Sequence, residues 1–202
     1  VSDIVSKEMF NFIDQGGESL TLRPEGTAPI ARALISNSLY EDQCQKFFYS
    51  GPMFRRERPQ AGRLRQFNQF GVEYFNQSSF LCDLEVIFLA NLIIKSLDIE
   101  NHIQLEINSI GNSLSRSNYI NELKSFFENY KNDLSPESQK RLLKNPLRIL
   151  DSKSTADIKI TENAPNILDF LDDKSLTFYK KLKDGLSELK FNYNENTNLV
   201  RG

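Results

Sequence analysis

The stretch GPMFRRERPQAGRLRQFNQFGVEYF, residues 51–75, decides the expected fold. Residues 46–57 and 64–75 are rich in aromatic side chains, which favour β-strands. Between them, Pro59-Gln60-Ala61-Gly62 has the composition of a turn. The pattern therefore predicts a long central β-hairpin.

One face of the second predicted strand has an unusual composition. Side chains alternate along a strand, so one face carries Phe67, Gln69, Gly71, Glu73 and Phe75. Gly71 is expected to leave room beside the two polar side chains. The pattern by itself fits either a ligand-binding surface or the solvated face of an antiparallel sheet.

Arginines are concentrated around the predicted turn. They are Arg55, Arg56, Arg58, Arg63 and Arg65. Guanidinium groups are planar donors that suit phosphate oxygens, although a solvated loop paired with nearby acids would have the same composition. Phe67 adds a flat stacking surface and Glu57 a hydrogen-bonding partner for a planar base. Together these features favour a nucleotide ligand.

Shorter elements flank this hairpin. Residues 9–13 and 19–23 predict a second, smaller hairpin around a turn with two glycines. Thr27 is expected to cap a helix. Residues 83–97 predict a largely buried helix, and residues 102–108 a returning strand.

The composition becomes polar and rich in lysine and asparagine after Gly111. Proline breaks and capping residues there predict several helices. The expected fold class is α+β, with a mostly antiparallel sheet flanked by helices and interrupted by a helical insertion. The predicted domains are 1–111, 112–192 for the insertion, and 193–202 for a return to the first domain.

Composition limits the possible functions. Lys+Arg 25 against Asp+Glu 27 gives a net charge of -2, so any nucleic-acid contact is expected to be local. Cys44 and Cys82 are too far apart in sequence to suggest a thiolate zinc site or a disulfide framework. His102, the single histidine, is expected to be structural and to open a strand. Residues 86–97 fall short of the roughly 20 needed to cross a membrane, and no signal peptide is visible, so a cytoplasmic protein is expected.

Four segments together resemble the histidyl-tRNA synthetases, a family of class II aminoacyl-tRNA synthetases. Residues 51–75 are similar to motif 2 of that family. The other three are LTLRPEGTA at 20–28, NPLRILDSK at 145–153 and NLVRG at 198–202, the last resembling the opening of a histidine-specific signature. The resemblance implies a class II catalytic core that activates histidine with ATP and Mg²⁺ and transfers it to tRNA(His), in a homodimer.

The resemblance also implies roles for matched residues. Those expected to bind histidine are Glu25, Thr27, Arg55, Gln69, Glu73 and Arg201. Those expected to bind ATP are Arg55, Glu57, Arg63 and Phe67. Arg55 and Arg201 are the expected catalytic residues, reaching the α-phosphate from opposite sides. Arg56 and Asn68 depart from the histidines common in bacterial relatives, on faces away from the site.

Motif 1 is expected to precede Val1, and motif 3 and the anticodon-binding domain to follow Gly202, so the isolated chain is expected to be inactive. Two other functions stay open. One is a histidine-binding regulatory subunit of ATP phosphoribosyltransferase. The other is a tRNA-contacting module that uses the cations of the helical region, which are Lys124, Lys131, Lys140, Arg141 and Lys144.

Overall fold

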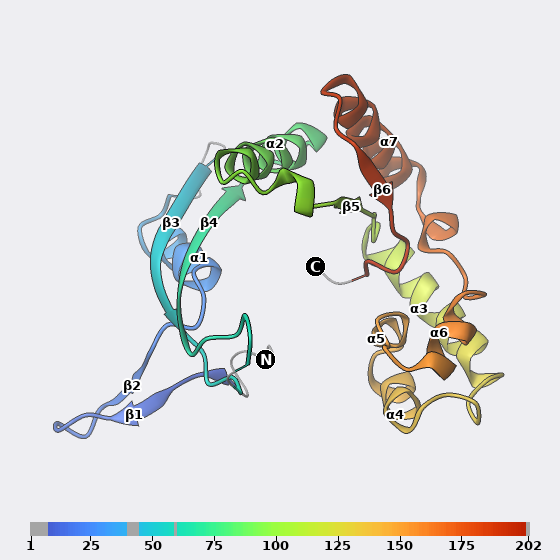
Figure 1. The fold of residues 1–202 in the computed structure, drawn as a ribbon, viewed down its shortest axis with the longest axis horizontal. Coiled ribbons are helices and arrows are strands. Elements are labelled where there is room, and N and C mark those ends of the chain that lie inside the picture. The colour runs from blue at the N-terminus through green and yellow to red at the C-terminus, as the bar shows by residue number, and fades with distance from the viewer. Residues whose placement is uncertain (1–7, 40–44, 59, 201–202) are drawn as a thin grey trace. The chain divides into compact units, whose positions relative to one another are not determined.

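The computed structural model describes residues 8–39, 45–58 and 60–200 and confirms the predicted α+β class (Figure 1). The chain forms two compact units, Val1–Ser78 and Ser79–Gly202. The first contains two β-hairpins and a helix, and the second is mainly helical. The predicted insertion boundaries lie elsewhere, at 111/112 and 192/193, and stay a prediction.

In the first unit, β1 (Asn11–Ile13) and β2 (Ser19–Thr21) form the predicted small antiparallel hairpin. Asp14 Oδ1 accepts a hydrogen bond from the backbone N–H of Glu18 at 2.8 Å. Gly17 adopts φ +86°, which glycine tolerates without steric cost. The turn forms because an aspartate and a glycine occupy the positions that need them.

The long hairpin consists of β3 (Gln45–Phe54) and β4 (Gln66–Phe75), which pair antiparallel over ten residues each, as predicted. Tyr49 lies opposite Gly71 in this register. Next to the turn, β3 ends at Phe54 instead of the expected residue 57, and β4 begins at Gln66 instead of residue 64. The arginine-rich connection therefore spans residues 55–65 and is wider than the predicted turn.

The first half of β4 alternates between exposed and half-buried side chains, and its sequence pattern left open which face would be enclosed. Gln69 and Glu73 lie on the half-buried face. Phe70, on the other face, is 51% exposed, and Phe48 on β3 is 74% exposed. The polar pair therefore occupies the more enclosed side of the hairpin.

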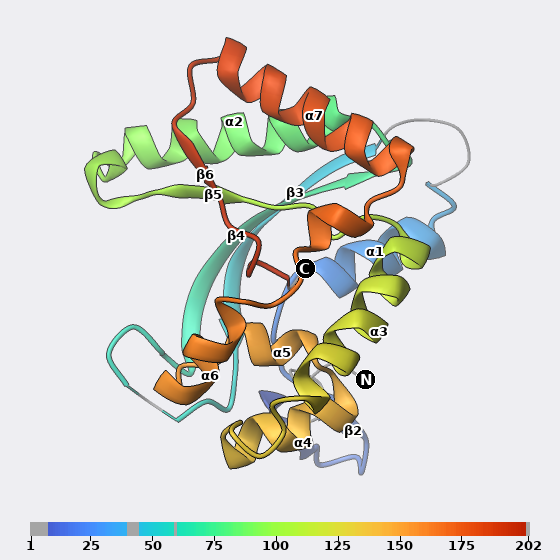
Figure 2. The same ribbon diagram turned by 90° about the vertical axis from the view of Figure 1, so that its right-hand side faces the viewer.

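The second unit consists of helices around two core clusters. Its elements are α2 (Phe80–Ser96), η2 (Glu100–His102), β5 (Leu105–Ile107), α3 (Ser113–Glu128), α4 (Pro136–Lys144), α5 (Leu147–Leu150), α6 (Thr155–Thr161), η3 (Ile167–Phe170), α7 (Asp173–Glu188) and β6 (Tyr193–Glu195). Helices α2 and α7 lie side by side (Figure 2). β5 and β6 pair in parallel although more than eighty residues separate them.

Both core clusters of this unit include residues from near its C-terminal end. Tyr119, Phe127 and Ile149 are buried in one cluster together with Val200. A second cluster packs Ile107 of β5 against the buried face of α7. At the C-terminal end, Tyr193 thus packs on the cluster that contains β5, whereas Val200 packs with α3 and α5.

A buried carboxylate ties α4, the residues after α5, and α6 together. Asp157 is fully buried and accepts hydrogen bonds from the Ser135 N–H at 2.8 Å, the Ser135 and Ser138 hydroxyls at 2.7 Å, and the Ser152 hydroxyl at 2.5 Å. Burial opposes ionisation, but these hydrogen bonds outweigh it and lower the pKa of Asp157. Ser135 also caps α4 by accepting a hydrogen bond from the Ser138 N–H, as serine before a helix commonly does.

Two expectations in this region are wrong. His102 ends the short helix η2, and the strand begins three residues later at Leu105. Helix α2 is apolar around its circumference, yet Cys82 is its buried residue, and Leu81 and Phe88 are 57% and 41% exposed. Hydrophobic composition predicted a buried helix, but burial depends on what packs against it. Within the described ranges, no helix is long and apolar enough to span a membrane.

Candidate functional site

Helix α1 (Thr27–Ser36) begins at the site, and the Glu25 side chain binds its first free N–H groups. Glu25 Oε2 accepts from the Thr27 N–H at 2.6 Å, and Oε1 accepts from the Ala28 N–H at 3.0 Å. A carboxylate at a helix N-terminus is stabilised by the free N–H groups and the helix dipole. The expected cap by Thr27 is wrong, because Gly26 holds the cap position and Thr27 is the first helical residue.

The Thr27 side chain does not cap the helix, and it instead connects the start of α1 to β4. Its Oγ1 donates to Glu73 Oε1 at 2.6 Å, across 46 residues of sequence. Hydrogen bonds to an ionised acceptor are shorter and stronger than neutral ones. This contact unites the predicted histidine-binding residues Glu25 and Thr27 with the polar face of β4.

The room expected above Gly71 is filled by an aromatic ring. A Cβ atom on Gly71 would lie 2.2 Å from Tyr49 Cζ, and one on Gly26 would lie 2.2 Å from Tyr49 Cε2. Real Cβ atoms do not approach other atoms so closely, so Tyr49 lies directly on both glycines. The sequence reading missed Tyr49. Counting outward from the turn would have placed it opposite Gly71 or one residue away.

Arg55 is held in place by three contacts with its own unit. Its Nε donates to the Pro24 carbonyl at 2.8 Å, and its Cζ lies 5.1 Å from the centroid of the Phe67 ring. Its backbone N–H donates to the Arg65 carbonyl at 2.9 Å. A stacked guanidinium with a fixed Nε is oriented in advance. Within the described residues, nothing binds the two Nη groups of Arg55, so both can meet an anion.

Glu57 and Gln69 each have a buried oxygen that needs a partner. Glu57 Oε2 and Gln69 Oε1 are buried and accept no hydrogen bond from the described part of the chain. Arg63 Nε lies 3.6 Å from Glu57 Oε2, which makes a loose ion pair, with Arg63 64% exposed. A buried unpaired polar atom costs about 1–3 kcal/mol, so such atoms indicate a missing ligand or water.

Arg201 lies outside the described residues, but the segment before it is well anchored. Asn108 Nδ2 donates to the carbonyls of Thr197 and Leu199 at 3.3 and 3.2 Å. The Asn196 N–H donates to the Ile107 carbonyl at 3.0 Å. The structure therefore fixes the start of the NLVRG signature onto β5 and its following residue. It brings together Glu25, Thr27, Gln69 and Glu73, and separately Arg55, Glu57, Arg63 and Phe67.

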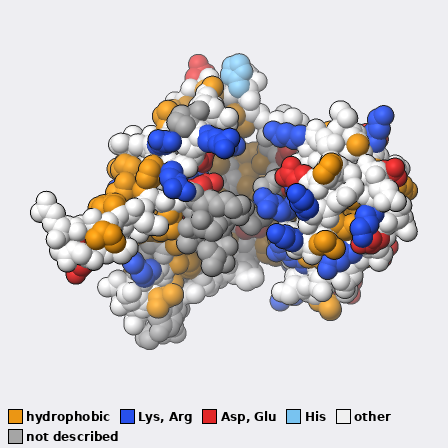
Figure 3. Space-filling model, turned by 90° about the horizontal axis from the view of Figure 1, so that it is seen from below, with side chains coloured by type: hydrophobic (Ala, Val, Ile, Leu, Met, Phe, Trp, Pro, Cys, Tyr) orange, Lys and Arg blue, Asp and Glu red, His pale blue; other side chains and the backbone are white. Residues whose placement is uncertain are grey.

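The cations proposed for RNA contact lie on the helical unit, where lysine and arginine side chains mix with acidic and apolar ones (Figure 3). Lys131 pairs with Glu128 at 3.1 Å, and Arg141 pairs with Glu137. Arg141 also donates to the Arg148 carbonyl at 3.0 Å. Two of the five proposed cations thus already have partners within the helical unit.

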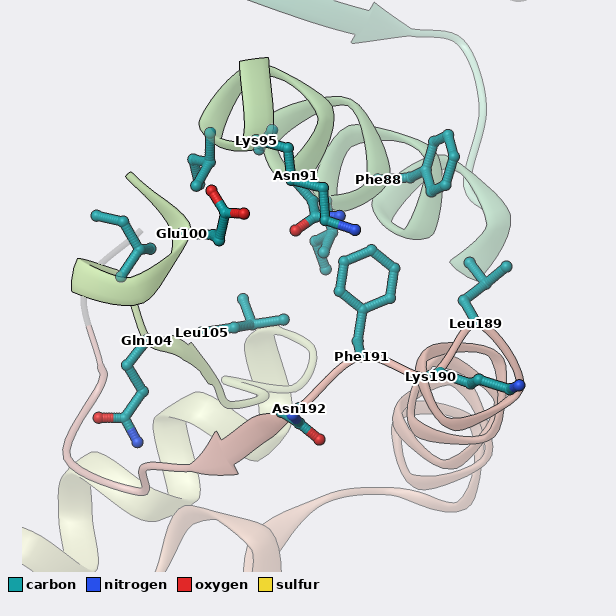
Figure 4. Close-up of a pocket in the computed structure, with 14 residues that line it drawn as sticks. Phe88, Asn91, Lys95, Glu100, Gln104, Leu105, Leu189, Lys190, Phe191 and Asn192 are labelled. Carbon is teal, nitrogen blue, oxygen red and sulfur yellow. The ribbon is translucent and has the colours of Figure 1, made fainter. Parts of the chain in front are cut away.

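A cleft of about 490 Å³ lies in the second unit between α2, the segment 100–105 and residues 189–192 (Figure 4). The Phe191 ring points toward α2 and meets Phe88 edge-on, with centroids 6.5 Å apart. The lining of the cleft is mostly apolar, and its polar residues include Asn91, Lys95 and Glu100. None of the predicted site residues lines it.

Comparison with known proteins gives consistent results. The family model for histidyl-tRNA synthetase matches residues 2–125. A histidine--tRNA ligase of Prochlorococcus marinus (strain AS9601) is 51% identical over 201 residues, 100% of this chain and 47% of that protein. One from Hydrogenovibrio crunogenus is 50% identical over 202 residues, with the same coverage. The chain spans about half the length of the curated relatives it matches.

Solved structures agree with this result. Apo histidyl-tRNA synthetase of S. aureus superposes with a TM-score of 0.74 at 37% identity, over 99% of this chain and 47% of that one. A Bacillus halodurans protein described as an ATP phosphoribosyltransferase regulatory subunit/histidyl-tRNA synthetase shares the fold, with a TM-score of 0.59 at 22% identity, over 94% of this chain and 52% of that one. The family model covers more than half of the chain, which therefore belongs to the histidyl-tRNA synthetase family.

Proposed function

We propose that the protein containing this chain activates histidine with ATP and transfers it to tRNA(His). The hydrogen bond from Thr27 to Glu73 carries the proposal, because it joins two segments matched independently to histidine binding. Two buried oxygens that accept no hydrogen bond from the described residues support it, since that of Gln69 belongs to the proposed amino-acid site and that of Glu57 to the proposed ATP site.

Activation is an in-line displacement at the α-phosphate of ATP. A carboxylate oxygen of histidine forms the new O–P bond, and the bond to the leaving pyrophosphate breaks. The carboxylate is already ionised at neutral pH, so no general base is needed. The barrier comes from repulsion between anions, which preorganised cations reduce. Arg55 would offer its Nη groups to the carboxylate and the α-phosphate, and its contacts with Pro24 and Phe67 support this role because they orient the guanidinium in advance.

The remaining hairpin residues suit the adenine and the outer phosphates. Glu57 Oε2, which accepts no hydrogen bond from the described residues, can accept from the adenine amino group, and the adenine would stack on the Phe67 face opposite Arg55. Arg63 is exposed and only loosely paired, so it can turn to an outer phosphate.

Mg²⁺ would come with the nucleotide. In the described residues, no three histidine, cysteine or acidic side chains form a metal cluster. Mg²⁺ retains several waters and is commonly held by phosphates with one or two carboxylates, so this part of the chain fits an ion carried mainly by ATP. When bound, it would neutralise charge on the phosphate oxygens.

Selectivity for histidine would follow from polar groups that only an imidazole satisfies. Glu73 uses Oε1 to accept from Thr27, and its other oxygen remains for a ring N–H. The buried Gln69 Oε1 is an acceptor, so it can serve the second ring nitrogen through a bridging water. An apolar side chain of similar size would leave both groups unpaired, which discriminates strongly.

Other features of the whole protein follow from the family. We propose a homodimer, a cytoplasmic location, and a helical insertion at 112–192 near the tRNA. The parallel pairing of β5 with β6 supports an insertion, because the segments on either side of it meet. Arg201 is proposed to reach the α-phosphate opposite Arg55.

The test is histidine-dependent exchange of pyrophosphate into ATP by the full-length protein. Exchange that depends on histidine, and on no other amino acid, is expected. Histidine binding in calorimetry without any exchange would instead support the regulatory-subunit function. Salt-dependent RNA binding with neither property would favour a tRNA-contacting module.

A further inference from the structure

Tyr49 occupies the centre of the proposed amino-acid site. Its ring lies on Gly26, just before α1, and on Gly71 in the middle of β4. Both positions must be glycine while the ring is there, because a Cβ at either would be 2.2 Å from a ring carbon. The ring thus sets the spacing between the α1 start and β4.

The same ring limits where a ligand can lie. Gln69 and Glu73 flank Gly71 on one face of β4, each two residues or about 7 Å away along the strand. The Tyr49 ring fills the space between them. A side chain that reaches both polar groups must therefore rest against this ring, and a planar aromatic ligand can do so by offset stacking or edge contact.

The Tyr49 hydroxyl is free to take part. Across residues 8–39, 45–58 and 60–200 it has no hydrogen-bond partner, and it is not among the buried polar atoms that lack one. A phenol can donate or accept, so it suits a ligand nitrogen on the same face.

We propose that Tyr49 is a specificity-determining residue of the amino-acid site, with its ring forming the surface on which the ligand imidazole rests and its hydroxyl bonding the ligand. This inference rests on the proposed function. It assigns a role to a residue that the resemblance did not include.

The experiment measures KM for histidine and for ATP in pyrophosphate exchange by the full-length protein. Tyr49→Ala is expected to raise the KM for histidine at least tenfold while the KM for ATP changes less than twofold. Tyr49→Phe, which keeps the ring, is expected to raise it two- to tenfold. Ser50→Ala is the matched control, since it removes a hydroxyl from the next residue, on the exposed face of β3.

Gly71→Ala gives a second, independent test. Its Cβ would displace the Tyr49 ring, so the KM for histidine is expected to rise at least tenfold in the wild-type background and by less than twofold in Tyr49→Ala. A purely structural role would lower the melting temperature without separating the two KM values. If neither Tyr49→Phe nor Gly71→Ala changes the histidine KM more than twofold, the inference is wrong. A wild-type protein without histidine-dependent exchange would reject the proposed function itself.

Discussion

Asp157 allows the sharpest stability test, because its surroundings are fully described. Replacing it with alanine removes the acceptor of four hydrogen bonds and strands at least two buried donors, the Ser135 N–H and the Ser138 hydroxyl. Each stranded donor costs about 1–3 kcal/mol, so two of them are expected to lower the free energy of unfolding by about 2–6 kcal/mol. Asp157→Asn should cost less, about 1–2 kcal/mol, because its carbonyl can still accept from Ser135.

The assay is urea unfolding of the 202-residue chain followed by circular dichroism. Asp184→Ala serves as control, because Asp184 is exposed on α7 and is expected to change stability by less than about 0.5 kcal/mol. A loss below about 1 kcal/mol in Asp157→Ala would refute the assigned network.

The pH dependence of this stability has a definite sign. Asp157 has a lowered pKa in the folded state, so its ionised form stabilises the fold at pH values above its ordinary value of 3.8. This contribution is lost as the pH falls below 3.8 through the folded pKa. The stability difference between wild type and Asp157→Asn is therefore expected to be constant near neutral pH and to shrink below about pH 4.

Two predictions concern the full-length protein. Arg55→Ala and Arg201→Ala are each expected to slow pyrophosphate exchange at least about a hundredfold, as loss of a preorganised donor typically does. Arg56→Ala is the control, because Arg56 lies on the exposed face, and its exchange rate should stay within about twofold of wild type. Near-normal exchange in Arg55→Ala would exclude the role of Arg55. Glu73→Ala is expected to weaken histidine binding in calorimetry about tenfold or more, since it removes a charged acceptor, and an unchanged affinity would show that Glu73 does not contact the ligand.

Local sequence patterns were sufficient to predict the features that depend on interactions between residues close together in the chain. The turn at Asp14 and Gly17, the cap at Ser135 and the two faces of β4 follow from nearest-neighbour hydrogen bonds and strand periodicity, and all are present. The exposure of α2 was not predictable in the same way. Its composition is largely apolar, but composition does not specify which side chains find a packing partner.

The sequence by itself determined the α+β class, the central hairpin and, through its motifs, the family. It also determined which residue types gather there, since a hairpin brings its own two strands together. Only the tertiary structure decided that Thr27 bonds Glu73 across 46 residues and that Tyr49 fills the space above Gly71. These contacts depend on where a loop before α1 meets β4, which is set by packing between segments far apart in the chain.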